Sequence, residues 1–183
     1  METPGRGSKT RRVPIRDDTL EVVPSVRPFK SMDICCMPHK YPNILIHLVF
    51  STKERADMIP NDLLPRLWKY FAGIGRNHDV PVLAAGGTSN HSHLLIVLPS
   101  DMAPAKAVQV LKANSSRWIR QHGIAFAWQE GYGAFSVSGS DKTAVMDYIE
   151  HQAEHHRSRS YETEFETMIR KSGMQFNADE AFG

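Results

Sequence analysis

Two histidines separated by one residue are the first feature of this sequence that could do chemistry. His91, Ser92 and His93 open an apolar run that continues to Leu98, and this pattern predicts a β-strand. Side chains alternate between the faces of a strand, so His91 and His93 should point the same way, about 6.6 Å apart along it. Two imidazoles so placed can chelate one divalent metal ion. The commoner role of such a pair is a half-exposed polar patch on an outer sheet face.

A tyrosine and a glutamine four residues apart form the second candidate. Tyr148 and Gln152 lie in a segment with helical periodicity, so their side chains should share one helix face. A tyrosine can act as a nucleophile that forms a covalent intermediate, but its pKa of about 10 requires a metal ion or a base at neutral pH. A glutamine carbonyl oxygen can serve as a neutral metal ligand. The alternative is that Tyr148 packs with Val145 and Ile149 in the core.

A third candidate is the cationic face of a helix expected from about Pro104 to Gln121. Lys106, Arg117 and Arg120 lie opposite its apolar side, with Lys112 beside them. Such a face could follow a phosphate backbone. An ordinary solvated surface is the more frequent explanation.

A histidine-rich run, His151, His155 and His156, could suggest zinc. No cysteine lies near it in the sequence, and a closed set of four ligands is not evident. A zinc site is therefore not favoured.

Hydrophobic periodicity predicts the elements that must position these residues. Strands are expected at 44–50, 81–85, 91–98 and 134–138, and residues 86–90 should form the turn of an antiparallel hairpin. A first helix should be capped by Asn61 and end near Asn77, and three more should span 104–121, 141–157 (capped by Ser140) and 161–171. This order predicts an α+β, ferredoxin-like or RRM-like β-α-β-β-α-β core. Its antiparallel sheet should have helices on one face and a further C-terminal helix that carries Tyr148.

Composition excludes several classes of protein. The chain has 183 residues and a net charge of +2, so bulk charge does not indicate a strongly basic nucleic-acid binder. Its longest mainly apolar run, residues 44–50, is far too short to cross a bilayer, and no secretory signal is evident. The two cysteines, Cys35 and Cys36, are adjacent, which favours a reducing, cytoplasmic setting.

The chain divides into three expected parts. Residues 1–40 are rich in Pro, Arg, Ser and Thr without periodicity, and we expect a disordered N-terminal extension. Met37 is a possible alternative start. A single domain should cover residues 41–160, and residues 161–183 should form a C-terminal helix and tail.

Residues 41–175 resemble the transposases of the insertion sequence 200/605 family, the single-tyrosine HUH-type enzymes. Five stretches in order carry the resemblance: 47–53 (HLVFSTK), 90–95 (NHSHLL), 111–119 (LKANSSRWI), 128–138 (WQEGYGAFSVS) and 148–156 (YIEHQAEHH). Ser92 stands where the family usually has a bulky hydrophobic residue, and Asn90 stands where it often has an aspartate.

The resemblance implies roles for individual residues. His91 and His93 would be ligands of a Mg²⁺ or Mn²⁺ ion, Gln152 would be the third protein ligand, and Tyr148 would be the nucleophile. The partners implied are single-stranded DNA with hairpin ends and a second copy of the chain. In such a homodimer, the tyrosine helix of one subunit serves the histidine pair of the other. Four cations become candidate DNA contacts: Lys106, Lys112, Arg117 and Arg120.

The activity implied is DNA transposition, in which single-stranded DNA at the ends of an insertion element is cut and rejoined through a 5′-phosphotyrosine. Such a protein would be cytoplasmic and associated with the nucleoid when bound to DNA. One alternative is a domesticated or inactive member that binds a particular sequence or hairpin. Another is a nucleic-acid-binding module without catalysis, since the ferredoxin-like sheet serves many functions.

Overall fold

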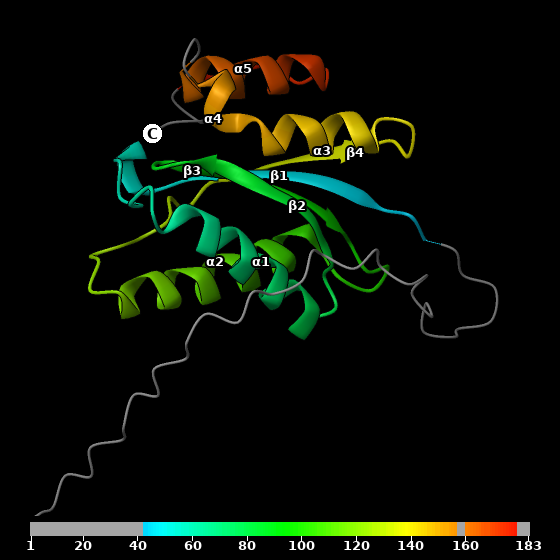
Figure 1. Cartoon of the computed structure of the whole chain (residues 1–183). Helices are drawn as coiled ribbons and strands as arrows, with labels where there is room; N and C mark the ends of the chain where they lie inside the picture. The colour runs from blue at the N-terminus through cyan, green and yellow to red at the C-terminus, as the bar shows by residue number, and fades with distance from the viewer. Residues whose placement is uncertain (1–41, 157–159, 179–183) are drawn as a thin grey trace, which may run out of the picture. The chain divides into compact units, whose positions relative to one another are not determined.

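A four-stranded antiparallel sheet forms the centre of the chain in the computed structural model (Figure 1). The structure describes residues 42–156 and 160–178, which fall within a unit that begins at Tyr41. The extension predicted for residues 1–40 lies outside the described residues. The strand order is β2-β3-β1-β4, in which both central strands carry apolar residues on both faces. The strands are β1 (Leu45–Ser51), β2 (Val82–Thr88), β3 (His91–Val97) and β4 (Gly133–Val137).

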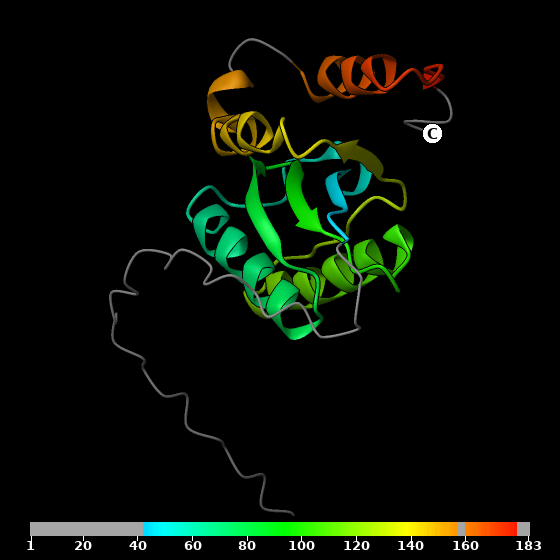
Figure 2. The same cartoon turned by 90° about the vertical axis from the view of Figure 1, so that its right-hand side faces the viewer.

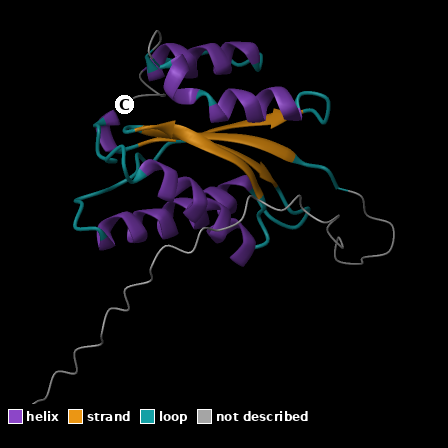
Figure 3. Ribbon diagram, in the orientation of Figure 1, coloured by secondary structure: helices purple, strands orange, loops and turns teal. Residues whose placement is uncertain are grey.

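Helices cover both faces of this sheet. On one face lie α1 (Leu64–Asn77) and α2 (Pro104–Gln121), and on the other lie α3 (Lys142–Glu150), α4 (Gln152–His155) and α5 (Tyr161–Lys171) (Figures 2 and 3). A short 3₁₀ turn, η1 (Lys53–Arg55), follows β1. The predicted α+β, ferredoxin-like order is confirmed. The expectation of helices on one face holds only for α1 and α2, because the C-terminal helices have an apolar side of their own to bury.

The two central strands direct alternate residues to two different layers. Leu48 and Phe50 of β1, with Leu94 and Ile96 of β3, pack against α1 and α2 in the main core. A fully buried side chain of this size contributes roughly 2 kcal/mol to folding. The intervening residues face α3 to α5, where a small cluster surrounds Ile149 and another surrounds Tyr161, Phe165 and Val49. The histidines of β1 and β3 have the parity of this second layer.

Glycine allows α3 to lie directly against β2. A Cβ atom on Gly86 would be 1.9 Å from the carbonyl oxygen of Ile149, so any larger residue would clash with helix backbone. Ile149 is itself fully buried. The backbone next to Tyr148 is therefore held against the sheet by the absence of a side chain at position 86.

Two predicted boundaries are wrong by a few residues. Asn61 does not cap α1, which begins at Leu64 with Pro65 in its first turn. Proline has no N–H to donate and suits the first turn, so the helix starts there and residues 61–63 form turns. Strand β2 continues through Gly86 and Gly87 to Thr88, because backbone pairing with β3 outweighs the low strand propensity of glycine.

The predicted helix 141–157 is interrupted. It forms α3 and α4, separated at His151, whose φ of −97° and ψ of 17° are not helical. The residue before the first helical one is Asp141, not Ser140, and its side chain makes no capping hydrogen bond. The break changes the direction of the chain between Tyr148 and Gln152, so their side chains reach the sheet from two helices.

Candidate metal centre and nucleophile

The paired histidines of β3 are completely buried. His91 and His93 have 0% exposure and face the layer of α3 to α5. The ring of His91 lies 4.3 Å from that of His156 and 5.0 Å from that of Tyr161, measured between centroids. The alternative of a half-exposed polar patch is therefore wrong, because the C-terminal helices cover this part of the sheet.

One nitrogen of each histidine is engaged and the other is not. Nδ1 of His91 lies 2.7 Å from Oδ1 of Asn90 and 3.0 Å from Oγ1 of Thr88. Nδ1 of His93 lies 3.0 Å from Nε2 of His47 on β1. Nε2 of both rings is buried without a hydrogen-bond partner among the described residues. Contacts of this kind orient metal-binding histidines, which then present the other nitrogen to the ion.

Burial keeps the imidazoles of His91 and His47 neutral. Desolvation, with the neighbouring His93, lowers the pKa of His91 to about 2 and that of His47 to about 3. A neutral imidazole has the free lone pair that a metal ion requires. His91 can therefore bind a cation at neutral pH without first losing a proton.

Gln152 completes a set of three unpaired acceptor atoms. Its side chain is 1% exposed, and its Nε2 donates to Oε1 of Glu164 at 2.9 Å. Within the part of the chain that the structure describes, its carbonyl Oε1 is buried without a hydrogen-bond donor, like Nε2 of His91 and of His93. Buried polar atoms in proteins are nearly always paired. Two imidazole nitrogens and an amide oxygen that lack donors are the atoms a divalent cation would satisfy, so these residues fit such an ion.

Tyr148 approaches the histidines of its own chain. Its ring is partly buried, with its centroid 6.1 Å from that of His93 and 6.3 Å from that of His47. It also contacts the apolar cluster around Ile149, so the alternative of core packing describes part of its environment. Its hydroxyl donates a hydrogen bond to Glu164. The structure thus brings Tyr148, His91, His93 and Gln152 together.

Two residues of this site, Glu164 and His47, were not among the sequence-based candidates. Oε2 of Glu164, on α5, lies 2.7 Å from Nε2 of His156, 3.5 Å from Nε2 of His93 and 4.0 Å from Nε2 of His91. Burial raises the pKa of Glu164, but the contacts with His156 and His93 outweigh burial and bring it well below its ordinary value. The available signal was a charge between Tyr161 and Phe165 on the apolar side of α5.

The histidine-rich run has one member in the site. His151 and His155 are exposed, whereas His156 is half-buried and contacts Glu164. One ligand atom from each of His91, His93, His156 and Glu164 lies within 4.8 Å of the others. The histidine-rich run therefore does not form a metal-binding cluster by itself, but His156 lies with His91, His93 and Glu164.

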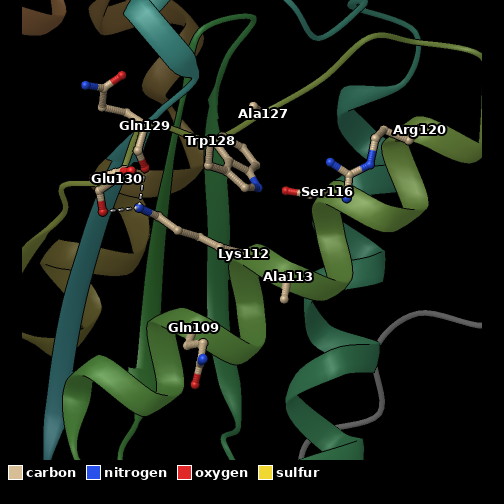
Figure 4. Close-up of a pocket in the computed structure, with 9 residues that line it drawn as sticks. All are labelled: Gln109, Lys112, Ala113, Ser116, Arg120, Ala127, Trp128, Gln129 and Glu130. Carbon is tan, nitrogen blue, oxygen red and sulfur yellow. Dashed lines mark hydrogen bonds between the residues drawn. The ribbon is translucent and has the colours of Figure 1, made fainter.

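The cationic residues of α2 lie on the other face of the sheet, away from the histidines. Lys106 and Arg117 are exposed. Arg120 is also exposed and donates to the carbonyl of Phe126 at 3.3 Å. Lys112 donates to the carbonyl oxygens of residues 129, 130 and 131 at 2.8, 3.2 and 2.7 Å. Arg120 and Lys112 line a shallow pocket of about 390 Å³ (Figure 4).

Within the described residues, no helix is long and apolar enough to cross a membrane.

Comparisons with known proteins point to one family. Residues 40–152 match the model of the IS200-like transposases. The transposase for insertion sequence element IS200 of Salmonella typhimurium strain LT2 is 26% identical over 126 residues, which cover 64% of this chain and 82% of the relative.

Two solved structures are also similar. A candidate transposase from Deinococcus radiodurans R1 has a TM-score of 0.48 and 21% identity, over 62% of this chain and 95% of the other. A REP-associated tyrosine transposase bound to a REP hairpin has a TM-score of 0.49 and 15% identity, over 64% of this chain and 72% of the other. The family match spans more than half of the sequence and contains the histidine pair, Tyr148 and Gln152. The chain belongs to the IS200-like transposase family.

Proposed function

We propose that this chain cuts and rejoins single-stranded DNA at the ends of an insertion element, with Tyr148 as the nucleophile. His91, His93 and Gln152 would hold a Mg²⁺ or Mn²⁺ ion beside it. The observation that carries the proposal is the convergence of three unpaired buried acceptor atoms near a tyrosine of the same chain. Membership of a transposase family supports the same reading.

The chemistry is an exchange of one phosphodiester for another. The hydroxyl oxygen of Tyr148 attacks the scissile phosphorus, and the bond from phosphorus to the 3′ oxygen breaks. The tyrosine loses its proton and the departing 3′ oxygen gains one, which leaves a 5′-phosphotyrosine and a free 3′-hydroxyl. A divalent ion held by His91, His93 and Gln152 would supply Lewis-acid polarisation of the scissile phosphate. A 3′-hydroxyl from another strand reverses the step and joins the DNA without ATP.

Membership of the IS200-like transposase family supports DNA as the substrate class. The REP-associated transposase was solved with a hairpin, and we propose that this chain also binds single strands with hairpin ends. Lys106, Arg117 and Arg120 offer exposed charges on α2 for this contact, and Lys112 lies beside them. We place the protein in the cytoplasm, where it would meet nucleoid DNA.

The tyrosine and the histidines can belong to one chain or to two. The family implies a homodimer that exchanges its tyrosine helices, whereas in the single chain Tyr148 lies beside its own histidines. Mixing Tyr148→Phe with His91→Ala separates these arrangements. Shared sites restore cleavage in the mixture, and sites built within one chain do not.

A covalent-capture assay tests the proposal. Purified protein is mixed with single-stranded oligonucleotides from both flanks of its gene, with Mg²⁺ or Mn²⁺, and run on a denaturing gel. We expect an adduct with the parent chain and none with Tyr148→Phe or in EDTA. An adduct that persists in Tyr148→Phe assigns the nucleophile elsewhere.

The second candidate function is hairpin binding without chemistry, in a domesticated or inactive member. The exposed cations of α2 would serve it equally well. It predicts that the protein binds oligonucleotides of both strands, with Mg²⁺ or with Mn²⁺, without forming a covalent adduct. It also predicts that His91→Ala binds DNA as well as the parent does.

A further inference from the structure

We infer that Glu164 of α5 is an additional protein ligand of the metal ion, supplied from outside the segment that matches the family model. This inference rests on the proposed function, because it concerns the same ion. It adds the carboxylate of Glu164 to the proposed ligand set of two histidines and a glutamine. Residue 164 lies twelve positions beyond the end of the matched segment at residue 152.

The carboxylate lies among the ligand atoms. Its Oε2 is 3.5 Å from Nε2 of His93 and 4.0 Å from Nε2 of His91. These two nitrogens lack hydrogen-bond partners among residues 42–156 and 160–178. The second oxygen, Oε1, accepts from Nε2 of Gln152, the residue whose carbonyl oxygen is also unpaired. Glu164 therefore contacts or closely approaches every member of the ligand set.

Its burial requires an explanation that helix packing does not give. Glu164 is 6% exposed on the side of α5 that buries Tyr161 and Phe165. A charged carboxylate is seldom buried unless a cation or several donors compensate it. Among the described residues, its hydrogen-bond partners are Tyr148, Gln152 and His156, which donate three hydrogen bonds but carry no fixed positive charge. A divalent cation beside Oε2 would supply that charge.

His156 holds the carboxylate in place. Its Nε2 lies 2.7 Å from Oε2 of Glu164, and its side chain is only 13% exposed. Carboxylate ligands in metal sites are commonly fixed by such a hydrogen bond. The resulting donor set has two imidazoles, which bind transition metals, and an amide and a carboxylate oxygen, which suit Mn²⁺ and Mg²⁺.

Manganese affinity of the full chain tests the inference without any DNA. Free Mn²⁺ is followed by its electron paramagnetic resonance signal as protein is added. We expect Glu164→Gln to weaken Mn²⁺ binding at least tenfold, because glutamine keeps the size but loses the charge. The matched control is Glu166→Gln on the same helix, where Glu166 pairs with exposed Arg170. It should bind Mn²⁺ as the parent does. Glu164→Asp, one methylene shorter, should also weaken Mn²⁺ binding. It replaces Glu164→Gln as the test variant if circular dichroism shows that Glu164→Gln is unfolded.

His91→Ala distinguishes the possible failures. If it abolishes Mn²⁺ binding while Glu164→Gln and Glu164→Asp bind like the parent, Glu164 is not a ligand and the proposed function stands. If Glu164→Gln binds Mn²⁺ more tightly, the carboxylate competes with the ion and the inference is wrong. If neither His91→Ala nor Glu164→Gln changes the affinity, the metal site of the proposed function fails as well.

Discussion

Nε2 of His47 on β1 lies 3.0 Å from Nδ1 of His93 on the neighbouring strand, and both rings are buried in the same layer. The two residues are 46 positions apart in sequence, but β1 pairs directly with β3, where Val49 is opposite His93. The contact fixes the orientation of the His93 ring and leaves its Nε2 directed at the site. His47 is thus a positioning residue for His93, a proposed metal ligand.

Replacing His47 should weaken the metal site without removing a ligand. We expect His47→Phe to lower Mn²⁺ affinity roughly 10- to 100-fold, as loss of a supporting contact does in other metal sites. Titration of Mn²⁺ by electron paramagnetic resonance measures the effect. His122→Ala, which removes an exposed histidine at the end of α2, is the control. Unchanged affinity in His47→Phe would show that the His93 ring is held by packing alone.

A side chain at position 86 should displace the helix that carries Tyr148. The added Cβ of Gly86→Ala meets the backbone of Ile149 at 1.9 Å, and backbone cannot rotate away as a side chain can. We expect a loss of about 1–3 kcal/mol in the free energy of unfolding. Urea denaturation gives this value. Gly131→Ala is the matched control, because its Cβ would meet no atom within 4 Å. Equal stability of the two variants would contradict the close packing of α3 on β2.

Lys112 and Arg117 should separate into a structural and a DNA-binding cation. Lys112→Met leaves three carbonyl oxygens without their donor, and we expect it to cost about 1 kcal/mol of stability. Arg117→Ala, at an exposed position, should change stability by less than about 0.5 kcal/mol. It should instead weaken binding to single-stranded oligonucleotides and reduce the salt dependence by about 0.7 of a logarithmic unit per decade. Thermal melts measure stability, and fluorescence anisotropy at several salt concentrations measures DNA binding. The prediction is wrong if Arg117→Ala lowers stability and Lys112→Met instead weakens DNA binding.

Acid should destabilise the metal-free protein. The pKa of His47 is lowered to about 3 and that of His91 to about 2, from an ordinary 6.5. Above pH 6.5 these histidines are neutral in both the folded and the unfolded chain, so they contribute no pH dependence to the free energy of unfolding there. Below it the unfolded chain takes up protons that the folded chain refuses, and each histidine removes up to about 1.4 kcal/mol per pH unit. Denaturation at pH 7 and pH 5 in EDTA measures this loss. His47→Phe should reduce the slope, whereas His122→Ala should not.

Local rules predicted the parts of this fold that are set by local contacts. The bounds of α2 and α5 were anticipated because their apolar faces repeat regularly and Pro104 and Gly173 lie at their ends. The shared direction of His91 and His93 followed from strand alternation. Pairing between strands decided the extent of β2, which no single-strand propensity could give.

The remainder of the site depends on contacts between distant segments. No spacing rule relates Glu164 or His47 to the histidines of β3, since they lie on other elements that meet only in the folded chain. The break at His151 was equally invisible, because a continuous helical pattern runs through it. The roles of Tyr148, Gln152 and the cations of α2 remain predictions that the experiments above address.

The burial of His91 and His93 has a kinetic consequence. Both rings have 0% exposure in the closed arrangement of α4 and α5, and a phosphodiester is too large to reach their Nε2 atoms through packed side chains. Under the proposed function, the layer of α4 and α5 would have to open before each round of chemistry. Opening of this kind takes microseconds or longer, and its rate would set an upper limit on turnover that a better leaving group could not raise.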